Sequence, residues 1–469
     1  MPTGLIGSAG FSRGRRSRRQ LIGGVAAASV LGGLAACGAP GAPAAGKPAA
    51  STKPVKLTYL NGHAPASVGA QKDDEQFKLF NQDEPNITVE VVLAGGPGAP
   101  GAREKFTTLA AGGTPPNMVQ NDWGVWMDHA RTGTIRELSS FFKTDKLSPD
   151  ATFLPIPIEQ YSFGGTLYGF PVSISSDSFA INKDLFDKAG IAYPPMDRQD
   201  PSWTLDKFVD VAQRLTKSGQ QSGMLSVHNY PFNRGTWYGR PSWDDAKRQA
   251  FMNHPDHIKG QQFWMDLVYK YRVLPIGDDA KQLAGGASNA FLAGNAAMYY
   301  TCCPLGLKDV QFHWALITMP YSGPAGSKSI SGRIWPHALH VAKNVPADQT
   351  DAVWTLFKWY MAKPEHAGLM PPSNSHQVSP YKDTKYSDLA QKDFEQQTNG
   401  VSGKAPYLTA QNTPPSACGM LKYEEYNAVD QATKDAWAKV EANQMAAKDW
   451  ADLAQKAIED AKLGSRGLS

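Results

Sequence analysis

The sequence predicts an α/β protein whose strands and helices form two lobes. The chain has 469 residues, enough for two large domains or about three of ordinary size. Strand-like and helical patterns alternate from residue 55 to residue 131, as in a sheet of parallel strands. A stretch in the middle, residues 164–195, is interpreted as the passage from one lobe into the other. The cleft between the lobes would then be the working site.

The first lobe is predicted to begin at residue 55. Alternating apolar residues predict strands, and apolar residues at helical spacing predict helices. The expected order is a strand at 55–60, a helix at 73–80, a strand at 87–93, a helix at 103–111, a short strand at 115–120 and a helix at 122–131. Open sheets of this kind bind ligands beyond the carboxyl ends of their strands. The loops that begin at Asn61 and Asn121 follow two such ends.

The passage between the lobes has two parts. Residues 167–181 are mainly apolar and aromatic, interrupted by Gly169, Pro171 and serines, and they predict an extended strand. A short helix follows, because Asn182 is a suitable N-cap and Gly190 a suitable C-terminal stop. We expect hinge positions near Pro171 and near Pro320.

The second lobe is predicted to contain mainly helical segments after this passage. Thr204 is the expected cap of a helix that begins at residue 205. Residues 257–271 form an amphipathic pattern, and residues 428–463 predict two C-terminal helices.

The N-terminus has the features of an export signal. Arg18 and Arg19 precede an apolar run of small residues, 21–36, which is shorter than the roughly 20 residues a membrane span needs. The paired arginines resemble a twin-arginine signal, and residues 34–37 (LAAC) resemble the lipobox of bacterial lipoproteins. This resemblance implies a signal peptide at 1–36, lipidation of Cys37 and a flexible tether at 37–54. The alternative is a transmembrane anchor that stays attached.

The charge of the chain gives no reason to expect a nucleic-acid partner. The formal net charge is +4, but residues 1–36 contain five arginines and no acidic residue. The rest of the chain has 42 basic and 43 acidic side chains. The basic character therefore belongs to the N-terminus alone.

The cysteines allow one disulfide after export but predict no metal site. Cys302 or Cys303 could pair with Cys418, or these cysteines could be buried thiols. Their spacing is not that of metal-binding cysteine pairs. We expect no cofactor and no bound metal.

Several segments, taken in order, resemble one protein family. The segments are residues 110–117 (AAGGTPPN), 133–138 (GTIREL), 165–171 (GTLYGFP), 182–191 (NKDLFDKAGI), 291–298 (FLAGNAAM), 312–320 (FHWALITMP) and 339–342 (LHVA). Together they resemble the family 1 extracellular solute-binding proteins of bacterial ABC importers, which include maltose-binding and multiple-sugar-binding proteins. Asn117 stands where the family usually has Asp. The resemblance covers about residues 55 to 462, and it rests on the order and spacing of the segments.

This resemblance implies the fold, the domain boundaries and the partners. The fold would be a periplasmic-binding-protein-like pair of lobes, with residues 55–170 and 324–370 in lobe 1 and residues 171–323 and 371–469 in lobe 2. The protein would be a monomeric lipoprotein on the outer face of the cytoplasmic membrane. It would capture a sugar or oligosaccharide by hinge closure and deliver it to the permease subunits of an ABC importer.

The candidate ligand-binding residues combine flat aromatic rings with polar groups, as recognition of a sugar requires. They follow predicted strands, lie in the two crossings, or lie in polar segments of the second lobe. The set is Asp122, Trp123, Asp177, Trp237, Tyr238, Trp243, Tyr300, Trp335 and His337. The alternative for the aromatic residues is packing in the core, and the alternative for Asp122 is a helix cap.

Two other classes of function remain open at this point. A binding protein for a peptide, a polyamine or a metal would share the fold, and two His-x-x-His pairs, 254/257 and 337/340, are the only metal-like spacing. A secreted carbohydrate-active enzyme is the second alternative. The chain contains no GxSxG or HExxH motif and no complete phosphate-binding loop. We therefore do not expect an enzyme.

Overall fold

Residues 51–469 form one compact unit in the computed structural model. The structure describes residues 53–62, 65, 68–94, 99–120, 126–197, 199–226, 231–240, 243–244, 249–287, 289–302, 307–322, 332, 334–367, 378–412 and 426–461. The predicted signal peptide, Cys37 and the tether up to residue 52 lie outside these residues. Cys303 and Cys418 also lie outside them, so the disulfide stays a prediction. None of the helices in the described part is long and apolar enough to cross a membrane.

The first sheet has five strands in the order β2-β1-β3-β13-β6. Their bounds are Ile87–Leu93, Val55–Asn61, Met118–Gln120, Ile334–Val341 and Phe170–Ser176. Strand β1 runs parallel to β2 and β3, whereas β13 is antiparallel to both of its neighbours. The predicted strand at 87–93 is confirmed with both ends in place, and the alternation of strands and helices in this lobe is confirmed as well.

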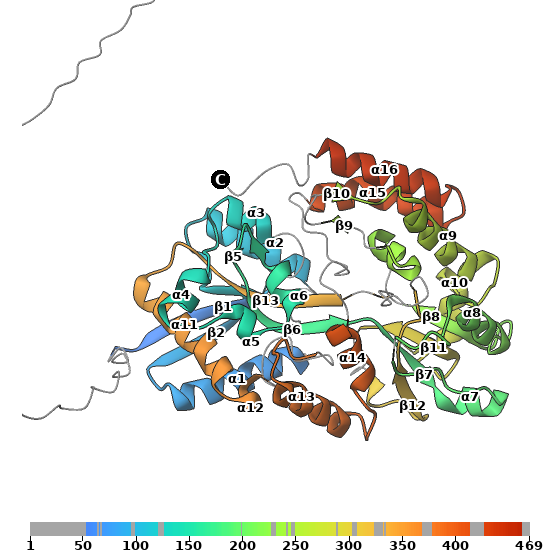
Figure 1. Cartoon of the computed structure of the whole chain (residues 1–469), viewed down its shortest axis with the longest axis horizontal. Coiled ribbons are helices and arrows are strands. Elements are labelled where there is room, and N and C mark those ends of the chain that lie inside the picture. Colours follow the sequence, from blue (N-terminus) through green and yellow to red (C-terminus); the bar gives the residue numbers. More distant parts are fainter. Residues whose placement is uncertain are drawn as a thin grey trace, which may run out of the picture. The chain divides into compact units, whose positions relative to one another are not determined.

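Helices surround this first sheet (Figure 1), and several of them share one hydrophobic core with it. They are α1 (Val68–Asp83), α2 (Ala99–Ala111), α3 (Trp126–Arg131), α4 (Ser139–Thr144), α5 (Pro149–Thr152), α6 (Pro155–Gln160), α11 (Ala347–Ala362) and α12 (Pro364–Ala367). A small hairpin, β4 (Ser162–Phe163) and β5 (Thr166–Leu167), precedes β6. Helix α1 begins five residues before the predicted start, because its first turn carries little of the apolar pattern.

The second sheet has four strands in the order β12-β7-β11-β8. Their bounds are Trp314–Ile317, Ser178–Asn182, Ala296–Thr301 and Ser222–Ser226. Strand β7 continues directly from β6, so the chain passes from the first sheet to the second at Asp177. Helix α7 (Lys183–Ala189) then begins as predicted. The side chain of Asn182 accepts a hydrogen bond from the Leu185 amide (3.3 Å), and Gly190 ends the helix at φ 64°.

The second core packs further helices against this sheet, with the two C-terminal helices included. The helices of this region are α8 (Leu205–Arg214), the 3₁₀ helix η1 (Pro231–Tyr238), α9 (Pro255–Tyr269), α10 (Gly277–Ala284), α15 (Tyr426–Glu441) and α16 (Ala447–Asp460). A second hairpin joins β9 (Trp243–Asp244) to β10 (Gln249–Ala250). The predicted cap is confirmed, because Thr204 accepts a hydrogen bond from the Lys207 amide (3.2 Å).

Two further helices contact both parts of the fold. Helix α13 (Thr384–Gln397) begins next to the first core, where Tyr386 stacks on Tyr381 at a ring distance of 4.1 Å. Near its other end, Phe394 packs edge-on against Trp314 of β12. Helix α14 (Lys404–Asn412) then contacts both β12 and β6. These contacts place the segment 378–412 along both parts of the fold.

Candidate functional site

The strands β6 and β13 carry the chain between the two sheets, and their outer halves form a two-stranded ribbon. We call residues 173–176 and 334–337 the crossing ribbon. In its register, Ser176 lies opposite Ile334, Ser175 opposite Trp335, Ile174 opposite Pro336 and Ser173 opposite His337. The register shifts by one residue after His337. Because side chains alternate along a strand and opposite residues share a face, the ribbon has two different faces.

The back face of the ribbon carries Ile174, Ile334, Pro336 and Ser176, and it is covered. Ile174 and Ile334 are fully buried and belong to a small hydrophobic cluster. Their partners in this cluster are Ile156 of α6, Ala410 of α14 and Val378, which precedes α13. Ile174 also exchanges two backbone hydrogen bonds of 2.8 Å with Val378. This face therefore attaches the ribbon to the rest of the fold.

The front face of the ribbon carries Ser173, Ser175, Trp335 and His337. The Ser175 hydroxyl and His337 Nε2 are 2.9 Å apart, within hydrogen-bond distance. The rings of Trp335 and His337 lie parallel within 7°, with their centroids 6.2 Å apart. Within the described part of the chain, the Ser173 hydroxyl is buried without a hydrogen-bond partner. Hydroxyls, an imidazole and an indole thus lie on one face, which is suited to a ligand with hydroxyl groups and C–H faces.

Asp177 lies where the ribbon enters the second sheet and is 1% exposed. The hydroxyl of Tyr300, on β11, donates a short hydrogen bond to its carboxylate. Gly332 of the second crossing lies against the same residue at φ +81°, a conformation that favours glycine. A Cβ added there would come within 2.7 Å of Met319 Cγ and 3.4 Å of Asp177 Cβ. The sequence-predicted residues Asp177 and Tyr300 are therefore brought together and contact each other.

The remaining candidates are placed differently from one another. Trp237 was expected in a polar loop, and that expectation is wrong. It lies in η1 within the second core, against Phe179, Phe263 and Tyr300, and is fully buried. Tyr238, the next residue, is 37% exposed and packs edge-on against Phe263.

The structure does not describe the side chains of three further candidates. Asp122 and Trp123 lie outside the described residues. Trp243 begins the short strand β9, and its side chain is not among those described. These three residues therefore stay predictions.

The histidine pairs that suggested a metal have other partners. His254 caps α9 by accepting a hydrogen bond from the Asp256 amide, and His257 Nε2 lies 2.8 Å from the Phe232 carbonyl. His340 Nδ1 lies 2.9 Å from the Tyr168 carbonyl, whereas His337 faces Ser175. Across the described ranges, no three histidine, cysteine or acidic residues gather as a metal site would require.

Sequence reasoning missed Ser173 as a candidate for the front face. The signal was available, because Val172, Ser173, Ile174 and Ser175 alternate between apolar and polar. Such alternation marks a strand with two different faces.

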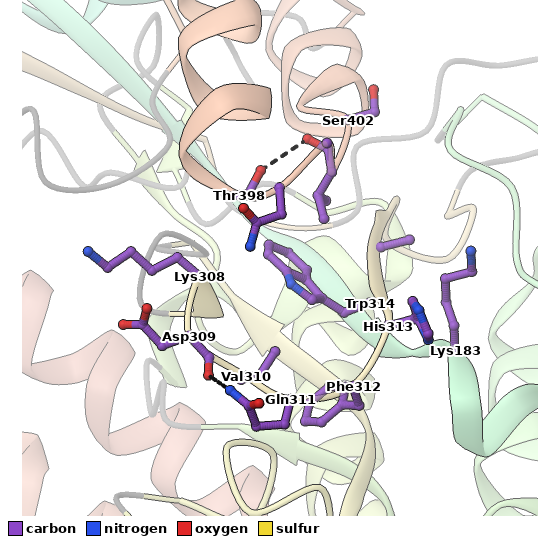
Figure 2. A pocket seen from close by; sticks show the side chains of 14 residues that line it. Lys183, Lys308, Asp309, Val310, Gln311, Phe312, His313, Trp314, Thr398 and Ser402 are labelled. Carbon is purple, nitrogen blue, oxygen red and sulfur yellow. Dashed lines mark hydrogen bonds between the residues drawn. The ribbon is translucent and has the colours of Figure 1, made fainter.

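A groove elsewhere in the second lobe is the main alternative to the ribbon (Figure 2). It has a volume of about 730 Å³ and is lined by Lys183, residues 308–315 and residues 398–402. Figure 2 shows Trp314 in its middle, with Lys308 and Lys183 on opposite sides. Trp314 pairs with Asn182, whereas Thr301 pairs with Ser178 at the Asp177 end of β7. The groove is therefore at the far end of β7, about 13 Å along the strand.

Three polar side chains of the groove already have local partners. Thr398 Oγ1 donates to the Phe394 carbonyl at 2.6 Å, and Gln311 Nε2 donates to the Asp309 carbonyl at 2.9 Å. His313 Nδ1 lies 2.9 Å from an Asp184 carboxylate oxygen. These groups do not converge on a common point, and we therefore place the candidate site on the front face of the ribbon.

Comparison with known proteins agrees with this architecture. The sequence profile of the bacterial extracellular solute-binding proteins matches residues 64–367. Among solved structures, an ABC substrate-binding protein from Listeria monocytogenes in complex with cycloalternan has a TM-score of 0.69 and 20% identity, covering 87% of this chain and 99% of that chain. A maltose-bound protein from T. maritima has a TM-score of 0.65 and 17% identity over 87% and 99% of the two chains. The cyclic alpha-maltosyl-1,6-maltose binding protein from Arthrobacter globiformis has a TM-score of 0.65 and 17% identity over 87% and 98%. All three share the two-lobed fold with this chain.

Proposed function

The chain belongs to the bacterial extracellular solute-binding proteins, and from this premise we propose that it binds a sugar or oligosaccharide on the front face of the crossing ribbon. The observation that carries the proposal is the pair of parallel rings, Trp335 and His337, beside two serine hydroxyls. Aromatic rings bind the C–H faces of sugars, and hydroxyl and imidazole groups bind their hydroxyls. The sugar-binding proteins that share this fold support the same choice of ligand.

In this proposal the ligand joins the two lobes and stabilises a closed form. Asp177 and Tyr300 link the ribbon to the second sheet, so a ligand on the ribbon lies beside the point where the lobes connect. A ligand that contacts both lobes binds the closed form more tightly and shifts the population toward it. The closed protein would then deliver its sugar to the permease subunits of an ABC importer. Export by the N-terminal signal and a lipid on Cys37 would hold a monomeric protein at the membrane.

The first experiment is a thermal-shift screen of the soluble chain from residue 51 onward. The panel contains maltose, maltotriose, cyclic oligosaccharides, monosaccharides, polyols, amino acids and divalent metals. A compound present at about 100 times its dissociation constant should stabilise the fold by about 2.7 kcal/mol. We expect one class of sugar to raise the melting temperature, and each sugar is also checked for turnover. A response to metals or amino acids alone would overturn the sugar proposal, and turnover would overturn the assignment as a binding protein.

A pair of tryptophan variants then locates the site. Trp335 on the ribbon and Trp314 in the groove are both 8% exposed, so they are matched in residue type and burial. We expect Trp335→Ala to weaken sugar binding by about 100-fold or more, because a buried aromatic anchor carries several kcal/mol of binding energy. Trp314→Ala should lower stability and leave the dissociation constant unchanged. The reverse result, measured by calorimetry, would move the site to the groove.

A further inference from the structure

We propose that Tyr161 is a positioning residue for the front face of the ribbon. Its hydroxyl donates a 2.6 Å hydrogen bond to the Pro336 carbonyl, and Pro336 lies between Trp335 and His337. Tyr161 is fully buried and comes from the segment after α6, 175 residues earlier in the chain. Its consequence for ligand binding rests on the function proposed above, whereas its effect on the ribbon does not.

The ribbon needs this hydrogen bond because of how β13 is paired. Ile174 directs both of its backbone groups toward Val378, with two hydrogen bonds of 2.8 Å. In an antiparallel pair, the residue opposite then also directs its backbone groups away from the shared ladder. Pro336 is that residue, so its carbonyl points away from β6. The absent N–H of the proline therefore costs no hydrogen bond between the two strands.

Among the described residues, no strand pairs with Pro336 on the side toward which it points. Strand β3 ends at Gln120 and pairs with β13 only from Leu339 to Val341. The Pro336 carbonyl therefore lies beyond the reach of that ladder. Tyr161 donates to this buried carbonyl and so satisfies it.

Tyr161 itself is held in place independently of the ribbon. Its amide donates to the Pro157 carbonyl at 3.1 Å, and its carbonyl accepts from the Tyr168 amide at 2.9 Å. Its ring packs edge-on against His340 at 5.4 Å and lies tilted against Trp126 at 6.2 Å. The hydroxyl can therefore be removed while the ring keeps its packing.

The carbonyl that Tyr161 holds belongs to the peptide unit that joins Pro336 to His337. A peptide unit is planar, so fixing its oxygen fixes the direction in which His337 leaves the strand. The imidazole of His337 then meets the Ser175 hydroxyl and lies parallel to Trp335. The register shift after His337 leaves this part of β13 with less support from a regular ladder. Tyr161 thus sets the geometry of the two rings without a place on the front face itself.

The test compares Tyr161→Phe with Tyr381→Phe. Tyr381 is buried in the same hydrophobic core as Tyr161, and its hydroxyl has no hydrogen-bond partner among the residues the structure describes. Both variants lose one buried hydroxyl and keep the ring. The first measurement is the ¹⁵N spectrum of the histidine rings without ligand, with the His337 signals identified by their loss in His337→Gln. We expect the His337 Nε2 signal to move in Tyr161→Phe and to stay in place in Tyr381→Phe.

The second measurement is the affinity for maltotriose by calorimetry. We expect about fivefold to tenfold weaker binding for Tyr161→Phe, the effect of one lost hydrogen bond, and no change for Tyr381→Phe. Unmoved His337 signals in Tyr161→Phe would overturn the positioning role, whatever happens to the affinity. If the His337 signals move but the affinity stays the same, the proposal that Tyr161 affects ligand binding is overturned. If the wild-type protein does not bind maltotriose, that ligand fails while the spectra still decide the role of Tyr161.

Discussion

The eight residues of the crossing ribbon form two faces of four residues each, and the two faces differ in character. On the back face, Ile174 and Ile334 are buried among apolar side chains of α6, α14 and Val378. On the front face, the Ser175 hydroxyl lies within hydrogen-bond distance of His337, the Trp335 ring lies parallel to the His337 ring, and the Ser173 hydroxyl has no described partner. The period of two along a strand separates the residues that hold the fold from those that we propose contact a ligand. A substitution on the back face should therefore affect stability, and a substitution on the front face should affect binding.

The largest expected effect is the loss of stability at acidic pH. It sets the pH range in which variants of the two faces can be compared. His129 and His257 are buried outside the ribbon, and burial lowers the pKa of each from 6.5 to about 4. The charge of Arg103 adds to this shift for His129, whereas the hydrogen bond to the Phe232 carbonyl opposes it for His257. Both are neutral in the folded state, and the unfolded chain binds their protons below about pH 6.5. The free energy of unfolding is therefore highest above that pH, where these histidines are neutral in both states, and it decreases as the pH falls toward 4.

This sign predicts acid destabilisation of both lobes. Between pH 7.5 and pH 5.0, each histidine should lower the free energy of unfolding by about 2 kcal/mol, or about 4 kcal/mol together. Urea unfolding at the two pH values measures the difference. The control is His129→Gln, which removes one of the two buried histidines and should reduce the difference by about 2 kcal/mol. Equal stability of the wild-type protein at both pH values would contradict the prediction.

The next effect tests the back face alone. Ile174→Ala removes a fully buried side chain from the small cluster behind the ribbon. Truncation of a buried isoleucine costs about 2–5 kcal/mol, because the cavity closes only in part. We expect a loss in this range by urea unfolding at pH 7.5, with the sugar dissociation constant changed less than threefold. A large loss of affinity at full stability would show that the two faces do not act separately.

The sequence allowed much of the fold to be predicted, because the relevant signals are local. The β-branched run of β2 predicts a strand with correct ends, and Asn182 and Gly190 mark both ends of α7. The position of Trp237 could not be predicted from its polar neighbours. Gly235 lies against His257 of α9, where a Cβ would come within 2.4 Å of a ring carbon, and η1, which contains both Gly235 and the buried Trp237, packs closely against α9. Such a contact depends on a helix that begins twenty residues later.

The candidate site was predictable in part for the same reason. The crossings and the residues Trp335 and His337 follow from local patterns and from a family resemblance. The hydrogen bond from Tyr161 to Pro336 joins residues 175 positions apart, and the Tyr300–Asp177 contact joins residues 123 apart. Local periodicity contains no information about such pairs, because each partner would be equally compatible with its own element without the other.

The smallest expected effect on stability is on the front face and gives the sharpest contrast with Ile174. Ser173→Ala removes a buried hydroxyl for which the described residues offer no hydrogen bond. Loss of an unsatisfied polar group is neutral or slightly stabilising, so the free energy of unfolding should stay within about 0.5 kcal/mol or rise. If a sugar hydroxyl supplies the absent partner, the same variant should weaken binding by about fivefold, measured by calorimetry at pH 7.5. Ile174→Ala would then change stability alone and the adjacent Ser173→Ala would change binding alone, as the alternation of side chains along the strand requires. A loss of stability in Ser173→Ala as large as in Ile174→Ala would show that the front face is packing, and the separation of roles across the ribbon would fail.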